Sequence, residues 1–166
     1  SDESIKKAHE NINKFSTKGN ELAKPLQSIL SNIMWEYCGV LKSKDLLEIG
    51  LKKVKEIKNL IPDVDVRFGY LNNDDLVQVF DLEASVFSAQ ATIISALQRE
   101  ESRGSHQRSD FPLLKRSENC NYQIKLNENS FDLEILKKNK KPLKNNLHET
   151  LKKVKRVSNF KNKLLE

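Results

Sequence analysis

The sequence is poor in glycine and proline, and this scarcity excludes several kinds of site. Only five of its 166 residues are glycine and four are proline. The glycines are scattered, so the chain has no phosphate loop, dinucleotide fingerprint or nucleophile elbow. We therefore expect no dinucleotide site here. The two cysteines, Cys38 and Cys120, lack a metal-binding spacing and predict two reduced thiols rather than a metal site or a disulfide.

Long apolar runs are also missing. No stretch approaches the roughly 20 apolar residues that span a bilayer, so direct membrane insertion is not expected. The first residues, Ser1 to Ser4, have neither a basic nor an apolar signal region. Met34 is the only methionine, so we expect the chain to belong to a longer or processed gene product.

Positive charge is concentrated near the C-terminus. The net charge is +6, and residues 137–163 hold eleven Lys or Arg but a single acid, Glu149. The remainder of the chain is therefore mildly acidic. Such a basic stretch is typical of a solvated helix face, of docking on an acidic partner, or of nucleic-acid binding. Phe160 is its only aromatic residue, and base stacking needs aromatic residues, so we expect no nucleic-acid partner.

Apolar residues recur at three- and four-residue spacing in five segments, which predicts five amphipathic helices. These helices are expected at about 5–19, 21–38, 44–61, 74–103 and 143–164. Gly39 and Gly104 are expected to end the second and fourth helices in the left-handed conformation, and Trp35 is expected in the core. The expected buried face of the fourth helix comprises Leu76, Phe80, Ala84, Phe87, Ala91, Ile94 and Leu97.

Two short segments alternate apolar and polar residues, at 122–126 and 131–135. This alternation with a four-residue turn between them predicts a β-hairpin. The expected fold is therefore mostly α: a three- or four-helix, spectrin-repeat-like bundle with a small β-hairpin and a C-terminal amphipathic helix. We expect one domain overall, with the bundle in residues 1–116, the hairpin and a basic linker in 117–141, and the last helix in 142–166.

The most informative segment is 99–112, where charged residues surround the expected end of the fourth helix. Glu100 and Glu101 lie where the helix dipole disfavours acids, so we expect them to have partners, with Arg103 within reach of Glu100. One interpretation is a solvated charge cluster, and the other is a network that docks the helix end onto another domain. His106 has no second His or Cys nearby, which favours a structural hydrogen bond over a metal or catalytic role.

At this segment the chain resembles the flavoprotein subunits of succinate dehydrogenase and fumarate reductase, and the related L-aspartate oxidases. Those families have a motif close to Glu-Ser-Arg-Gly-x-His-x-Arg-x-Asp-Phe-Pro after a long helix. The residues that match it are Glu101, Ser102, Arg103, Gly104, His106, Arg108, Asp110, Phe111 and Pro112. A second pattern, Met-Trp-x-x-x-Gly-Ile/Val with a following basic residue, is matched by Met34, Trp35, Gly39 and Val40, with Lys42 where the family usually has Arg.

The resemblance implies a C-terminal structural domain that braces the FAD-binding domain of the same chain. The parent enzyme would use FAD to move hydride to or from a dicarboxylate, while this fragment holds no cofactor and is not catalytic alone. Residues implied in docking are Glu101, Arg103, His106, Arg108 and Asp110. An iron–sulfur subunit is an implied partner, and the implied location is cytoplasmic, at the inner face of a membrane through partner subunits.

Two other functions remain open on sequence alone. The chain could be the C-terminal domain of an L-aspartate oxidase, although the expected hairpin and basic stretch are more typical of succinate dehydrogenase subunits. It could also be an independent basic helical module that binds nucleic acid through residues 137–163. An upstream flavin fingerprint in the full gene would distinguish the flavoprotein from this module.

Overall fold

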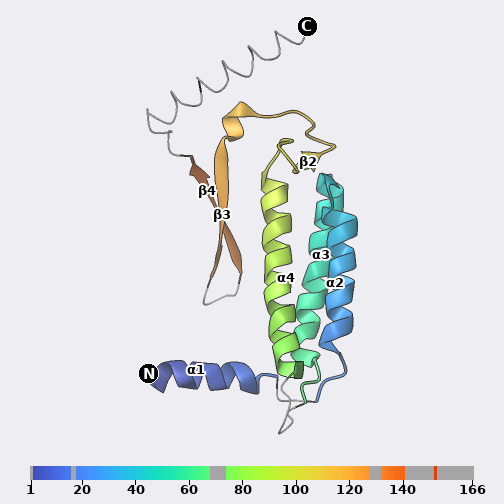
Figure 1. The fold of residues 1–166 in the computed structure, drawn as a ribbon, viewed down its shortest axis with the longest axis vertical. Coiled ribbons are helices and arrows are strands. Elements are labelled where there is room, and N and C mark those ends of the chain that lie inside the picture. Colours follow the sequence, from blue (N-terminus) through green and yellow to red (C-terminus); the bar gives the residue numbers. More distant parts are fainter. Residues whose placement is uncertain (1, 16–17, 68–73, 128–131, 141–151, 153–166) are drawn as a thin grey trace.

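Three long helices lie side by side and form the body of the molecule (Figure 1). They are α2 (Ala23–Cys38), α3 (Lys44–Leu60) and α4 (Asp74–Gln98). The structure is a computed structural model, and it describes residues 2–15, 18–67, 74–127, 132–140 and 152. The predicted C-terminal helix at 142–166 falls outside the described residues, apart from Lys152. None of the described helices is long and apolar enough to cross a membrane.

The core runs along the shared axis of the three helices. Its most deeply buried members in α3 and α4 are aliphatic residues with at most 1% of their surface exposed: Leu47, Val54, Val79, Leu82, Val86 and Ile93. The prediction of which face of α4 is buried was therefore wrong. Ala84 on the predicted face is exposed, and the other residues of that face are only partly buried. Apolar residues occupy more than one side of α4, since it packs against α2, α3 and the hairpin, so the spacing alone did not select the inner face.

The first helix, α1 (Asp2–Asn13), projects sideways from the foot of the bundle rather than lying within it (Figure 1). It ends before Phe15, which is 1% exposed. The Phe15 ring packs edge-to-face on that of Phe80, with 5.5 Å between centroids. Lys14 adds an ion pair to Glu83, at 2.9 Å. The chain is thus attached to the bundle by Phe15 and Lys14, immediately after α1.

Two predictions about α2 were wrong. Trp35 is 83% exposed instead of lying in the core. It follows the buried Ile33 by two residues, about 200° around the helix, which turns it away from α3 and α4. Gly39 has φ −62° and ψ −162°, so α2 does not end in a left-handed residue. Ser43, in contrast, caps α3 as the sequence suggests, accepting a hydrogen bond from Leu46 N at 3.3 Å.

Two pairs of strands complete the fold. The strands β1 (Leu41–Lys42) and β2 (Gln107–Arg108) pair in parallel, and join segments from before α3 and after α4 at one end of the bundle. The predicted hairpin is present: β3 (Cys120–Leu126) and β4 (Leu133–Asn139) pair antiparallel and lie along α4 (Figure 1). β4 begins two residues later than predicted and extends to Asn139. Two 3-10 turns, Ile61–Asp63 and Arg116–Glu118, lie in the connections. The mostly helical bundle with a small hairpin is therefore confirmed.

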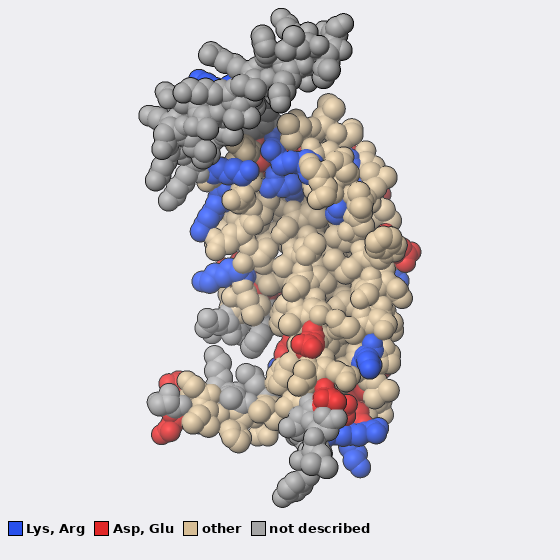
Figure 2. All heavy atoms as spheres, in the orientation of Figure 1, with Lys and Arg blue, Asp and Glu red and all other residues tan. Residues whose placement is uncertain are grey.

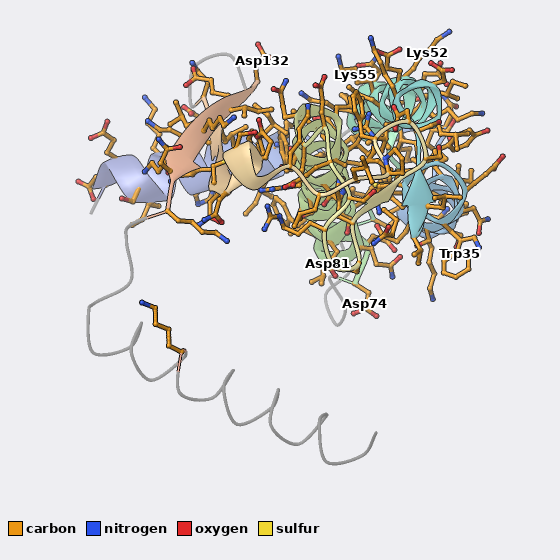
Figure 3. All side chains as sticks on the ribbon, turned by 90° about the horizontal axis from the view of Figure 1, so that it is seen from above. Trp35, Lys52, Lys55, Asp74, Asp81 and Asp132 are labelled. Carbon is orange, nitrogen blue, oxygen red and sulfur yellow. The ribbon has the colours of Figure 1, made fainter. Side chains whose placement is uncertain are left out.

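Gly50 marks a close approach of α3 to α2. A Cβ added there would lie 2.7 Å from Tyr37 Cβ, which is closer than carbon atoms pack. Ala normally stabilises a helix by up to about 1 kcal/mol relative to Gly, but overpacking costs about 1–3 kcal/mol. We therefore expect Gly50→Ala to lower the free energy of unfolding, measured by urea denaturation. Lys52→Ala, at an exposed position of the same helix (Figure 3), is the matched control. An unchanged or raised stability of Gly50→Ala would show that α2 and α3 separate easily here.

Candidate docking site at the end of the bundle

Arg108 is a buried cation at the end of α4. It is only 2% exposed, and its Nη1 donates to Ala96 O at 2.7 Å and, more distantly, to Leu97 O and Arg99 O, both at 3.4 Å. The last carbonyls of a helix have no partner within the helix and carry its negative dipole end. Arg108 therefore supplies both the donors and the positive charge that this helix end lacks.

Asp110 extends this contact to the start of α3. Its two carboxylate oxygens accept from Arg108 Nε and Nη2, both at 2.7 Å. Oδ2 also accepts from Lys44 N, the first residue of α3, at 2.9 Å. Arg108 above all, and then the Lys44 amide, hold the pKa of Asp110 well below its usual range. One bidentate ion pair thus joins the C-terminus of α4 to the N-terminus of α3.

Glu101 is the centre of a second buried group. It has no exposed surface, and it accepts from Arg103 Nε at 2.8 Å, Arg103 Nη2 at 3.1 Å, Arg99 Nη1 at 2.7 Å and Lys115 N at 2.8 Å. The Arg103 hydrogen bonds are the largest influence on its pKa, followed by burial, which opposes them, and then by Arg99 and Lys115. The net effect lowers the pKa of Glu101 to about 2. Glu101 is therefore ionised at neutral pH although it is buried.

A tight turn connects the two groups. Arg103 and His106 exchange backbone hydrogen bonds of 2.7 and 3.0 Å, with Gly104 between them at φ +57°. Glycine fits this left-handed position, but the turn lies six residues beyond the end of α4 and is not its cap. Ser102 Oγ accepts from Arg108 N at 2.9 Å and donates to Phe111 O at 2.9 Å.

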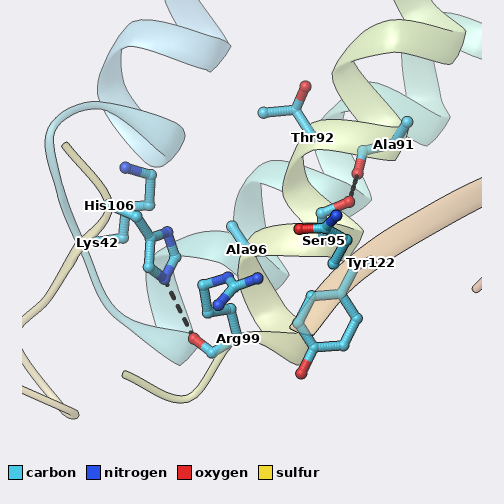
Figure 4. Close-up of a pocket in the computed structure, with 9 residues that line it drawn as sticks. Lys42, Ala91, Thr92, Ser95, Ala96, Arg99, His106 and Tyr122 are labelled. Atoms are coloured by element: carbon cyan, nitrogen blue, oxygen red, sulfur yellow. Dashed lines mark hydrogen bonds between the residues drawn. The ribbon is translucent and has the colours of Figure 1, made fainter. Parts of the chain in front are cut away.

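His106 makes the structural hydrogen bond that the sequence favoured. Its Nε2 lies 3.2 Å from Arg99 O and donates to that carbonyl (Figure 4). Burial first, and then the nearby cations Lys42, Arg108 and Arg99, lower the pKa of His106, outweighing the Arg99 carbonyl, which raises it. The ring is therefore neutral at neutral pH.

The structure places all five residues implied in docking at one end of the bundle. Glu101 contacts Arg103, Arg108 contacts Asp110, and the turn brings His106 beside both pairs. The expected Glu100–Arg103 pair is absent from the described ion pairs, because α4 ends at Gln98 rather than Arg103 and the helical spacing does not apply. Glu100 instead lies 3.6 Å from Lys115 Nζ, at the surface.

Sequence reasoning missed Arg99 as the residue that ties the hairpin to the bundle. Arg99 Nη2 donates to Cys120 O at 2.9 Å and Nη1 donates to Glu118 O at 3.3 Å, while the guanidinium lies 5.1 Å from the Tyr122 ring centroid. Tyr122 Oη donates to Glu118 Oε2 at 2.8 Å and lies 3.1 Å from Gln98 O. The hairpin begins about twenty residues after Arg99, so no local sequence pattern around Arg99 indicated this contact.

Exposed apolar side chains occur next to this polar network. We call them the apolar rim; with their exposed fractions they are Trp35 (83%), Val40 (69%), Leu41 (65%), Leu113 (78%) and Leu114 (55%). Trp35 lies in the last turn of α2, and Val40 and Leu41 lie just before and at the start of β1. Leu113 and Leu114 lie in the segment that the hydrogen bond from Ser102 N to Leu113 O, of 3.2 Å, holds in place. Figure 3 shows Trp35 projecting outward from α2. Exposed apolar side chains of this size are often found at contact surfaces.

Comparison with known proteins identifies the family. Residues 27–157 match the family model described as "Fumarate reductase flavoprotein C-term". Because this match covers more than half of the sequence, the chain belongs to the family of C-terminal domains of succinate dehydrogenase and fumarate reductase flavoproteins. The resemblance seen in the two sequence motifs is thereby confirmed.

Individual relatives place the match within longer proteins. An uncharacterised FAD-dependent oxidoreductase of Methanocaldococcus jannaschii is 37% identical over 75% of this chain and 22% of its own length. A succinate dehydrogenase flavoprotein subunit of Rickettsia felis is 32% identical over 61% of this chain and 18% of its own. An L-aspartate oxidase of Nicotiana tabacum is 32% identical over 64% and 16%. The chain thus spans about a fifth of the length of these relatives.

A solved structure shows the same fold. The chain superposes on a quinol fumarate reductase chain of E. coli with a TM-score of 0.80 and 18% identity, over 86% of this chain and 25% of the other. At this identity the likeness establishes the fold and not the activity.

The described residues do not fit FAD. Dinucleotide sites are built on a strand that leads through a glycine-rich turn into a helix. The only parallel strands in the described part of the chain are β1 and β2, two residues each, and both lead into Ser rather than a glycine-rich turn. No step of flavin chemistry is therefore assigned to residues of this chain.

Arg108→Ala should be strongly destabilising. It would leave helix-end carbonyls of α4 without their donor and Asp110 without its counter-ion, and breaking a buried ion pair costs about 3–5 kcal/mol. Arg108→Lys should recover part of this loss, because an ammonium keeps the charge but not the paired geometry. Lys115→Ala, which removes the exposed partner of Glu100, should cost at most about 1 kcal/mol. Chemical denaturation measures all three, and an Arg108→Ala loss no greater than that of Lys115→Ala would contradict the bridging role.

Glu101 should contribute to the acid sensitivity of the domain. Its folded pKa of about 2 lies below the ordinary value of 4.5, so its stabilising contribution is fully present above about pH 4.5 and is lost as the pH falls towards 2. Glu101→Gln should therefore flatten the dependence of unfolding free energy on pH within this window. The exposed neighbour Glu100→Gln is the control. Equal slopes for Glu101→Gln and the unsubstituted chain between pH 2 and 4.5 would refute the assignment.

Proposed function

We propose that this domain braces the FAD-binding domain of a succinate dehydrogenase or fumarate reductase flavoprotein. The parent enzyme transfers hydride between FAD and a dicarboxylate. FAD supplies the redox chemistry, and the residues that bind FAD lie outside this chain. The contribution of this domain is mechanical: it holds a neighbouring domain in register. The proposal is supported by the family match and by the content of the bundle end.

One observation carries the proposal: a rigid polar network lies beside an exposed apolar rim at the same end. The network holds buried charges with short, bidentate contacts, as in the 2.7 Å bonds between Arg108 and Asp110. The apolar rim offers Trp35, an aromatic residue of the kind that dominates binding energy at interfaces. A fixed polar scaffold beside exposed apolar anchors is the arrangement that a stable inter-domain contact needs.

The five docking residues divide into two roles in this proposal. Glu101 and Arg108 are buried, so they position the others without touching the neighbour. Arg103 and Asp110 have 33% and 30% of their side chains exposed, and His106 is half-buried, so these three can contact the FAD-binding domain directly. Arg103 also binds Glu101, so its substitution would disturb this domain as well as the contact. Trp35 is therefore the cleaner probe.

Partner subunits and location follow from the same proposal. The relatives include proteins named as flavoprotein subunits, and the structural likeness is to a quinol fumarate reductase chain. We propose an iron–sulfur subunit as a further partner and a position on the cytoplasmic side of the membrane, reached through partner subunits. Figure 2 shows Lys and Arg side chains gathered near the hairpin and the adjoining bundle end, where an acidic partner surface would be complementary.

An L-aspartate oxidase is the second candidate for the parent enzyme. The Nicotiana tabacum relative carries that name and is as similar as the Rickettsia subunit. The hairpin favours the first candidate, since it forms as two seven-residue strands in the region where the resemblance expects one. Assay of the full flavoprotein with succinate and with L-aspartate distinguishes the two.

Trp35 should be shielded only when the neighbouring domain is present. It is the only tryptophan of the chain, so the fluorescence of the isolated chain reports it directly. We expect strong acrylamide quenching there, and weak quenching in the full flavoprotein, where subtracting the Trp35→Phe spectrum isolates its emission. Equal quenching in both proteins would refute docking through the apolar rim.

The same residue should matter for the flavoprotein and not for this domain. Trp35→Ala should change the unfolding free energy of the isolated chain by about 0.5 kcal/mol or less, as expected for an exposed site. In the full flavoprotein it should lower flavin retention. Val77→Ala, which truncates an exposed apolar residue near the N-terminus of α4 at the other end of the bundle, is the matched control and should leave retention unchanged.

A further inference from the structure

A cleft lies between the last turns of α4 and strand β3. Its volume is about 720 Å³, which is within the range of small-molecule sites. Lys42 and His106 lie on one side, and Arg99, Ser95 and Tyr122 on the other (Figure 4). All charged residues that line this cleft are basic, and none of its described lining residues is an acid.

Lys42 is the unusual member of this set. It is only 9% exposed, and its ammonium donates to Val40 O at 3.2 Å. Among the described residues no carboxylate pairs with it, whereas Arg99 pairs with Glu101 and Arg108 pairs with Asp110. Burial of a charge is costly unless a counter-ion compensates it. The cleft therefore holds one buried positive charge that the described part of the domain does not neutralise.

The charged groups around Lys42 are suited to an anion. His106 Nε2 donates to Arg99 O, so Nδ1 of the neutral ring carries no proton, and the ring reports a group that binds beside it rather than holding that group. Arg99 adds positive potential from the far wall, although Glu101 already balances much of its charge. The cations that lower the pKa of His106 indicate the same positive potential. Glu118 lies behind Tyr122 and is occupied by Tyr122 and Lys137.

We propose that this cleft binds a carboxylate group, with the Lys42 ammonium as its counter-ion. A single negative charge matches the single uncompensated ammonium, whereas a phosphate dianion exceeds it. The carboxylate belongs either to a small free acid or to an Asp or Glu side chain of the adjoining FAD-binding domain. The second source rests on the proposed function, and the first does not.

The test is a titration of the chain with sodium acetate and with sodium succinate, at constant ionic strength kept with chloride. The His106 imidazole resonances report binding, and we expect saturable shifts with dissociation constants in the millimolar range. Lys42→Met should weaken binding at least tenfold, while Lys42→Arg should retain it, since Arg keeps the charge. Lys52→Met removes an exposed lysine outside the cleft and should have no effect. Melting curves confirm that each variant is folded.

Two results would overturn the proposal: no saturable shift with either acid, or equal binding by the unsubstituted chain and folded Lys42→Met. A water-soluble carbodiimide applied to the full flavoprotein then identifies the source, because it joins an amine to a carboxylate in contact. An amide between Lys42 and an acid of the FAD-binding domain assigns the cleft to a side chain. Acetate binding that persists in the full flavoprotein assigns it to a free acid. Trp35 shielding is independent of both, so failure of docking is distinguishable from failure of the cleft.

Discussion

The structure depends on one ion pair, between Arg108 and Asp110, which joins the ends of two helices. The carbonyl end of α4 is the negative end of its dipole and receives a guanidinium, while the amide end of α3 is positive and receives a carboxylate. Each charge therefore has the sign that its helix end favours, and each also neutralises the other. Because Arg108 is buried and the Asp110 side chain is 30% exposed, salt screens this pair less than it screens a fully exposed one.

The other contacts at this end are built around that pair. β2 contains Arg108 and pairs with β1, and Ser109 N donates to Lys42 O at 2.8 Å, so the segment is fixed on both sides. Glu101 then gathers Arg99, Arg103 and the Lys115 amide, and Arg99 reaches on to the hairpin. Local charge pairs thus connect the bundle, the turn and the hairpin into a single unit, and they leave the apolar rim exposed beside it.

Much of this could be predicted from the sequence, and the exceptions have physical causes. The three long helices, the Ser43 cap and the hairpin follow from spacing and turn residues, which are local signals. The five residues that the motif implied in docking lie together at one end of the bundle. The prediction of the inner face of α4 was wrong because apolar residues cover several sides of this helix. The predicted end of α4 was wrong because the side chain of Arg108 donates to the last carbonyls of the helix. In a longer helix, backbone amides would have paired with those carbonyls. Trp35 was misplaced because its hydrophobicity predicted burial, whereas its position about 200° around α2 from the buried Ile33 turns it outward.

The parallel pairing of β1 with β2 has a consequence for how the domain comes into being. Lys44 and Asp110 are 66 residues apart, and all of α3 and α4 lies between them. The helices can form from neighbouring residues, but this end closes only after the chain has emerged as far as Asp110 and the bundle has assembled. A chain that ends before Asp110 therefore lacks this closure even where its helices are intact. The closed end is thus a property of the finished bundle and of no single helix.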